Sequence, residues 1–341
     1  MAALFPIYWR WLGLPLSRAK GEVVDRLPFS LVETTIWIGV AFASMLALAA
    51  LTGRWRALRS RPSLFALLTA GPAILICMAL GQGAFPLSLA PTAWRLPLAR
   101  AFPSPPLPYA DFKRELAARE ERLLRTFSPD YYLSFSEAEI LSGCDRLLDG
   151  ELAALRLPGG RQVRRLKGMG PLTTLLGLSY GGPAFHDPFF GELAMVSPAD
   201  HPAPRYWRLI GACHEAAHAK GFTREMDAEI LTQLALESST DPRYRMLGDI
   251  MFLRKSGERV HYPEWLRGEM RMMWDSLARV ERRQPAVRFL RSASRKLGFQ
   301  NTGGKYGSRT GSEAWNPDHP FYATITRLRK EREAGRVGDG R

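Results

Sequence analysis

Two histidines four residues apart, His214 and His218, form the part of the sequence best suited to catalysis. Positions i and i+4 of a helix share a face, so both imidazoles can bind one metal ion. Glu215 follows the first histidine and can take a proton from a water molecule, then donate it to a leaving amine. The HExxH pattern therefore predicts a zinc-dependent hydrolase. The plainer interpretation is a helix that carries two incidental histidines.

A catalytic zinc ion needs a third protein ligand, and two carboxylates follow the histidines. Glu225 and Glu229 are also four residues apart, so they share a helix face. One carboxylate can bind the metal while the other accepts the free N–H of a ligand histidine and fixes its tautomer. The plainer interpretation of both glutamates is a solvated acidic face.

A chain reversal must separate the histidines from these glutamates. On an unbroken helix, Glu225 would lie ~10 Å along the axis from His218, too far to share a metal ion. Gly221 is the residue that permits the chain to turn back. We therefore expect a helix over residues 206–220, a turn at Gly221, and a second helix over 225–238 with Thr223 as its N-cap.

The HExxH pattern followed by ExxA resembles the gluzincin metallopeptidases. The wider sequence resembles a family of bacterial membrane proteins known as domain of unknown function 3810. This resemblance implies that His214, His218 and Glu225 bind the metal, that Glu215 is the general base, and that the fold is zincin-like. The segments that carry the resemblance are RLPFSLVETTI (Arg26–Ile36), GELAMV (Gly191–Val196) and CHEAAHAKGFTREMDAE (Cys213–Glu229).

Other parts of a peptidase site are less sharply marked. A donor to the oxyanion is expected, and Tyr244 is our candidate, with His261 and Tyr262 as alternatives. Residues 193–196 can form an edge strand that pairs with extended substrate, although an ordinary core strand is an equal alternative. We expect Cys213 to be a core residue and not a ligand.

Two apolar runs near the N-terminus predict membrane spans. Leu31–Leu51 has 21 residues with Glu33 as its only charge, and Ser63–Phe85 has 23 residues with no charge. Each is long enough to cross ~30 Å of hydrocarbon. Four arginines lie between the runs, so the positive-inside tendency makes that loop cytoplasmic and everything after residue 86 extracytoplasmic. The alternative interpretation is a pair of buried core helices.

The composition excludes several classes of protein. With 341 residues, 46% of them hydrophobic and 23% charged, the chain is neither disordered nor collagen-like. Three cysteines allow at most one disulfide. The net charge of +14 suits anionic lipid headgroups. Arginines interleave with acids along the predicted helices, and no nucleic-acid-binding motif appears, so we expect no nucleic-acid partner.

The expected fold is mainly α with a small β component. Two transmembrane helices precede a helical, zincin-like extracytoplasmic domain. Further helices are expected over residues 111–127, 136–155, 244–255 and 263–283, and strands near 175–180 and 193–196. The predicted organisation is an interfacial segment (1–30), two spans (31–85) around a basic cytoplasmic loop (52–62), a Pro-rich connector (86–110), the metallohydrolase domain (111–330) and a disordered tail (331–341).

These patterns together predict a membrane-anchored, Zn²⁺-dependent metallohydrolase. We expect a multi-pass protein of the bacterial inner membrane whose partners are the lipid bilayer and a peptide or protein substrate. Two other functions stay open: a non-enzymatic membrane scaffold with a structural or vestigial metal site, and a metal hydrolase that acts on a non-peptide substrate.

Overall fold

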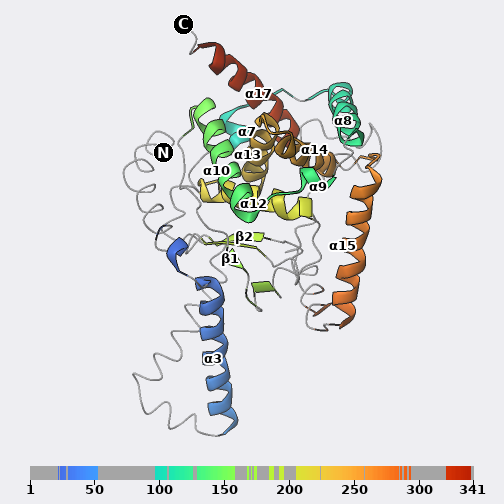
Figure 1. The fold of residues 1–341 in the computed structure, drawn as a ribbon. Coiled ribbons are helices and arrows are strands. Elements are labelled where there is room, and N and C mark those ends of the chain that lie inside the picture. Colours follow the sequence, from blue (N-terminus) through green and yellow to red (C-terminus); the bar gives the residue numbers. More distant parts are fainter. Residues whose placement is uncertain are drawn as a thin grey trace.

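The computed structural model has a helical body, a small sheet and a long apolar helix that extends from the body (Figure 1). This confirms the prediction of a mainly α fold with a small β component. The structure describes residues 22, 24–27, 30–52, 97–105, 107–125, 129–157, 167–168, 170, 173–174, 184–187, 192–195, 205–222, 224–256, 258–283, 285, 288–289, 292 and 320–338.

Helix α13 (Glu225–Ser238) lies at the centre of the helical body. Residues 227–236 are all buried, because neighbours cover this helix on every side. Its neighbours are α10, α12, α14 and α17. The helices have these bounds: α7 (Leu98–Ala101), α8 (Tyr109–Leu124), α9 (Pro129–Tyr132), α10 (Glu137–Ala154), α12 (Arg205–Ala219), α14 (Pro242–Ser256), α15 (Glu264–Arg283) and α17 (Pro320–Gly338).

Helix α10 begins as the sequence predicts. The Ser136 side chain accepts a hydrogen bond from the Glu139 amide, and the Glu139 carboxylate accepts one from the Ser136 amide. This reciprocal capping box satisfies two donors that the first turn leaves free. The apolar face behind it, with Ile140, Leu148 and Leu152, is buried in the core.

Three short strands form a sheet in the order β1-β3-β2. Strand β3 (Glu192–Met195) confirms the strand predicted near residues 193–196. It pairs with β1 (Lys167–Gly168) in parallel and with β2 (Ala184–Asp187) in antiparallel fashion. Because β3 has a neighbour on each side, our interpretation of it as a substrate-binding edge strand is wrong. Helix α12 packs against β2 and β3, and the strand predicted at 175–180 lies outside the described residues.

Helix α3 (Leu31–Leu51) extends away from the helical body (Figure 1). Its apolar side chains are open to the surroundings, with Leu48 62% exposed and Leu51 86% exposed. Within the described residues, one helix is long and apolar enough to cross a membrane, over Glu33–Leu51. The second predicted span (63–85), residues 53–62 of the basic loop, and residues 1–21 lie outside the described part of the chain.

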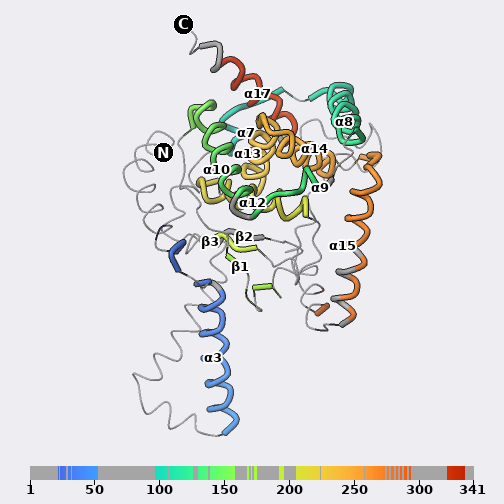
Figure 2. The backbone as a smooth tube through the Cα atoms, viewed as in Figure 1, coloured from blue at the N-terminus to red at the C-terminus, as the bar shows by residue number. Residues whose placement is uncertain are grey.

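Two boundaries of the predicted organisation need correction. Part of the Pro-rich connector is helix α7, whose Leu98 is buried and whose Leu98 amide donates a hydrogen bond to Asp227 of α13 at 3.0 Å. Helix α17 continues to Gly338, so residues 331–338 are helical where we expected a disordered tail. Figure 2 traces α17 back onto the helical body, where it packs against α13 and α10.

Candidate metal centre

The reversal that the sequence predicts lies at Gly221. Its backbone φ is 97°, a left-handed conformation that glycine adopts without a Cβ clash. The Gly221 amide donates to the carbonyl of His218 at 2.8 Å, and the Phe222 amide donates to that of Ala217 at 3.4 Å. These bonds close α12, as left-handed glycine caps do. The N-cap of α13 is Arg224, which makes no side-chain capping bond, and not the predicted Thr223, which lies outside the described residues.

This turn brings the three predicted ligands together. The Nε2 atoms of His214 and His218 lie 3.1 Å apart. Glu225 has one carboxylate oxygen 3.1 Å from Nε2 of His214 and the other 3.6 Å from Nε2 of His218. Within the described part of the chain, these three side chains form a group whose ligand atoms all lie within 4.8 Å of one another.

The spacing of these atoms suits a tetrahedral zinc ion. Ligand bonds of about 2.0–2.1 Å at tetrahedral angles place neighbouring ligand atoms about 3.3 Å apart. The two Nε2 atoms are 3.1 Å apart, and one oxygen of Glu225 is 3.1 Å from Nε2 of His214. The other oxygen of Glu225 is 3.6 Å from Nε2 of His218. Two imidazoles and one carboxylate are also a donor set found in catalytic zinc sites, which keep a fourth position open. The Glu225 side chain is 65% exposed, so solvent reaches one side of the group.

The two acidic side chains set the electrostatics of the histidines. Burial alone would lower the pKa of His218, but the hydrogen bond that it donates to Glu225 and the negative charges of Glu215 and Glu225 raise it to about 9. Partial desolvation beside the imidazoles opposes ionisation of Glu225, yet hydrogen bonds from both histidines hold its pKa far below its usual range. The group therefore collects negative charge around a point where a cation would fit.

Glu215 lies beside the metal-binding group. Its side chain is buried, with the residue 9% exposed, and it is close enough to His218 to raise the pKa of that histidine. Because it sits on α12 directly after His214, its carboxylate can serve the same site without acting as a ligand. Its role as general base stays a prediction from the sequence.

A backbone atom holds His218 in place. The Nδ1 atom of His218 lies 2.6 Å from the carbonyl oxygen of Phe222, which leaves Nε2 directed at Glu225 and His214. The sequence predicts a glutamate in this role, Glu229 where Glu225 is the ligand, but for His218 the acceptor is the Phe222 carbonyl. Glu229 is buried and forms an ion pair with Lys255 of α14. The residue type at position 222 gives no signal for such a carbonyl bond; only the glycine before it marks the turn.

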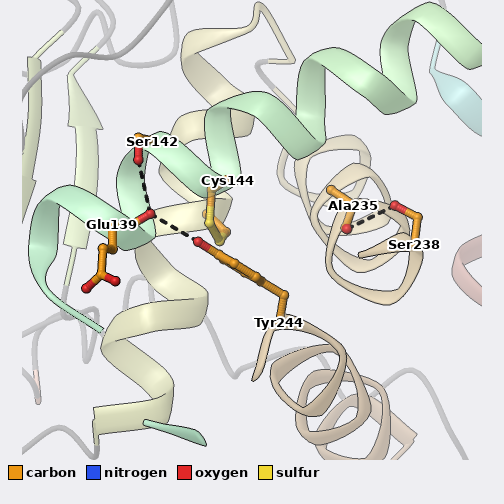
Figure 3. Close-up of a disulfide and its surroundings, with 7 residues drawn as sticks. Glu139, Ser142, Cys144, Ala235, Ser238 and Tyr244 are labelled. Carbon is orange, nitrogen blue, oxygen red and sulfur yellow. Dashed lines mark hydrogen bonds between the residues drawn. A yellow bond between two sulfur atoms is a disulfide. The ribbon is translucent and has the colours of Figure 1, made fainter. Parts of the chain in front are cut away.

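Tyr244 has a structural partner in place of the predicted catalytic role. Its hydroxyl donates a hydrogen bond to the backbone carbonyl of Glu139 in α10 at 3.0 Å, and burial raises its pKa. Figure 3 shows the ring lying between α14 and α10, next to a disulfide. Because this bond already uses the hydroxyl proton, we withdraw Tyr244 as the oxyanion donor.

The two alternative donors also have other surroundings. His261 is 89% exposed and binds the Glu120 carboxylate through its amide and its Nδ1, each at 2.8 Å. Burial raises the pKa of Tyr262 to about 12. Among the described residues, no hydrogen bond or ion pair joins His261 or Tyr262 to His214, His218 or Glu225, so neither is placed as an oxyanion donor.

Cys213 is a core residue, as predicted, and also forms a disulfide with Cys144 of α10. The Cα atoms are 5.2 Å apart, within the usual range for such a bond. The bond lies one residue before His214, and Figure 3 shows it beside Tyr244. It ties α12, which carries His214 and His218, to α10. The sequence allows one bridge but does not identify the partners, which lie 69 residues apart.

Comparisons with known proteins add no further assignment. No protein-family model matches the chain, and neither a curated protein nor a solved structure matches it. The functional argument therefore depends on the geometry of the residues themselves.

Proposed function

We propose that this protein is a membrane-anchored zinc metallopeptidase. The observation that carries the proposal is the convergence of His214, His218 and Glu225 from two helices, with one ligand atom from each lying within 4.8 Å of the others. An ion pair between Glu225 and two incidental histidines is the plainer interpretation of this convergence, and metal analysis distinguishes the two. The resemblance to gluzincins and to the domain of unknown function 3810 family supports the metallopeptidase.

In this proposal each residue has one role. His214, His218 and Glu225 hold the zinc ion, which when bound supplies a Lewis acid that polarises a carbonyl group and activates water. Glu215 takes the proton from the attacking water and gives it to the departing amine, which is the work of a general base and then acid. The carbonyl of Phe222 keeps the Nδ1 proton on His218, so that Nε2 has its lone pair free for the metal.

Two features support a location outside the cytoplasm, with the chain anchored in the bacterial inner membrane. Helix α3 is apolar and long enough to cross the bilayer. The Cys144–Cys213 disulfide is of a kind that persists in oxidising compartments and is rare in the cytosol. The second apolar run, Ser63–Phe85, would return the chain to the side on which it entered.

Metal analysis of the purified full-length protein is the first test. We expect about one zinc ion per chain, and loss of that zinc in His214→Ala and His218→Ala, because two remaining ligands seldom hold the ion. His261→Ala is the matched control, since this histidine is exposed and bound to Glu120, and it should leave the zinc content unchanged. Equal zinc in the wild type and in a His214→Ala/His218→Ala double variant would refute the site.

Separate substitutions of Glu215 and Glu225 distinguish the base from the ligand. Glu215→Gln should keep its zinc. Its turnover of casein or of a peptide library should fall by about 10²–10⁴-fold, because an amide cannot take the proton. Glu225→Gln should lose zinc affinity first, since an amide oxygen is a poorer ligand than a carboxylate. If the wild type and Glu215→Gln both bind zinc but do not differ in their turnover of peptides, a scaffold or a non-peptide substrate would be favoured.

A further inference from the structure

A completely buried lysine lies in the turn between the two ligand-bearing helices. Lys220 has a side chain that is 0% exposed, and its Nζ is 2.7 Å from Oδ1 of Asp145 and 2.8 Å from Oδ1 of Asp149. Both aspartates lie on α10, four residues apart and on one face. The contacts are ion pairs by distance without the alignment of hydrogen bonds.

Such a group is costly to bury. An ammonium ion taken out of water loses several kcal/mol of hydration unless opposite charges compensate it, and even a compensated pair often adds little net stability. What a buried pair does contribute is a defined geometry, since the charges tolerate few other arrangements. Lys220 therefore acts on the position of its turn more than on the stability of the domain.

The turn that Lys220 fixes is the one on which the metal centre depends. Lys220 follows His218 by two residues, and the next two residues are Gly221, with its left-handed backbone, and Phe222, whose carbonyl orients His218. The Lys220 amide also donates to the carbonyl of Ala216 at 3.0 Å, in the last turn of α12. A shift of this segment would move the carbonyl from Nδ1 and swing α13 with its ligand away from the histidines.

Helix α10 holds the HExxH segment on both sides. The Cys144–Cys213 disulfide is attached one residue before His214, and the adjacent Asp145 holds Lys220 two residues after His218. The ligand-bearing segment is thus fixed to one rigid helix at two places.

We propose that Lys220 is a positioning residue for the metal centre, acting through Asp145 and Asp149. The inference depends on the proposed zinc site. Its pairing with α10 pre-organises the turn at 220–222, so that the carbonyl of Phe222 meets His218 and Glu225 reaches both imidazoles. Residues that orient metal ligands from outside typically change metal affinity by about 10–100-fold when they are lost.

Lys220→Met tests this with the full-length protein, because methionine keeps the apolar length and removes the charge. The matched control is Arg332→Met: Arg332 of α17 forms a similar buried ion pair with α10, at 3.1 Å from Glu151, away from the turn. We expect Lys220→Met to weaken zinc binding by about 10–100-fold in a chelator competition. Arg332→Met should leave zinc affinity near wild type, although thermal unfolding of both zinc-free variants should occur at lower temperature.

The absorption spectrum of the cobalt-substituted protein reports the geometry of the metal ligands, and a general loss of stability does not change it. The d–d bands should change position or intensity in Lys220→Met and not in Arg332→Met. Asp149→Asn, at a half-exposed position, gives a milder variant in case Lys220→Met does not fold, and its zinc affinity should fall by a smaller factor in the same direction.

Equal zinc affinity in the wild type and in folded Lys220→Met or Asp149→Asn would overturn the inference, as would equal losses in Lys220→Met and Arg332→Met. These outcomes leave the zinc site itself intact. A wild-type protein without zinc affinity would instead overturn the proposed function, and the role of Lys220 with it.

Discussion

Gly221 decides whether Glu225 can reach the histidines, because it reverses the chain within the few residues between α12 and α13. A side chain at φ 97° meets its own backbone, and the left-handed region costs an ordinary residue about 1–2 kcal/mol. The ligand geometry is therefore coupled to one backbone conformation.

Gly221→Ala should lower both stability and zinc affinity. We expect a loss of about 1 kcal/mol or more in the free energy of unfolding, measured by urea denaturation of the zinc-free protein. Gly150→Ala is the control, because a Cβ at this exposed position in α10 has no atom within 4 Å. That variant should be neutral or more stable by up to about 1 kcal/mol. Equal stability of the two variants would contradict the argument.

The side chains that could bind a metal ion were predictable from the sequence, but the backbone atom that orients one of them was not. His214 and His218 share a face of α12 because they are four residues apart, and Glu225 of α13 meets them because the chain turns back at Gly221. The Phe222 carbonyl was missed, since every residue has a carbonyl. Tyr244 was misassigned because a hydroxyl is as often a structural donor as a catalytic one.

At the scale of elements, a buried ionic cluster joins α8, α13, α14 and α17. Arg119 of α8 donates to Glu237 of α13 at 2.7 Å and to Asp249 of α14 at 2.8 Å. Arg329 of α17 donates to the same Glu237 at 2.6 Å. The helices around the central α13 are therefore bound by charge as well as by apolar packing.

This cluster makes stability depend on acid pH. Burial opposes ionisation of Glu237, but Arg329 and Arg119 lower its pKa to about 2. Because this pKa lies below the usual 4.5, the stability that Glu237 contributes is complete above pH 4.5 and is lost as the pH falls toward 2. Glu237→Gln should cost about 3–5 kcal/mol at pH 7 and flatten the acid limb of thermal unfolding curves.

The control for this prediction is Glu121→Gln, which alters an exposed ion pair between Glu121 and Arg125 within α8. An exposed pair contributes about 1 kcal/mol or less, so this variant should keep the wild-type pH profile. An unchanged acid limb in Glu237→Gln would show that the arginines do not stabilise its ionised form.

The long, strongly patterned helices were predictable, and the short or terminal ones were not. The four residues of α7 are too few to give a periodic signal. For α17, the charges near residue 331 suggested disorder, yet Phe321, Ile325 and Leu328 recur at helical spacing and are fully buried. That spacing indicates a helix over residues 321–328, and the helix continues to Gly338 through residues without a periodic apolar signal.

For the whole molecule, the orientation in the membrane is the main prediction. In a Cys77→Ala background, Ser60→Cys should react with an impermeant thiol reagent only from the cytoplasmic side, and Ser308→Cys only from the outside. The basis is the arginine-rich loop between the two apolar runs. Reaction of both positions from the same side would mean that one run does not span the bilayer.

The apolar helix is joined to the rest of the molecule by its one charged residue. Glu33 accepts hydrogen bonds from the amide and the hydroxyl of Thr173, at 2.8 and 2.7 Å, and from the indole of Trp37 at 2.8 Å. Thr173 follows β1 in the sequence, and β1 belongs to the sheet against which α12 packs. A shortened version that starts at residue 97 would remove the carboxylate that accepts from the Thr173 amide, so α3 belongs to the folding unit, and deleting it to obtain a soluble protein would disturb the segment after β1.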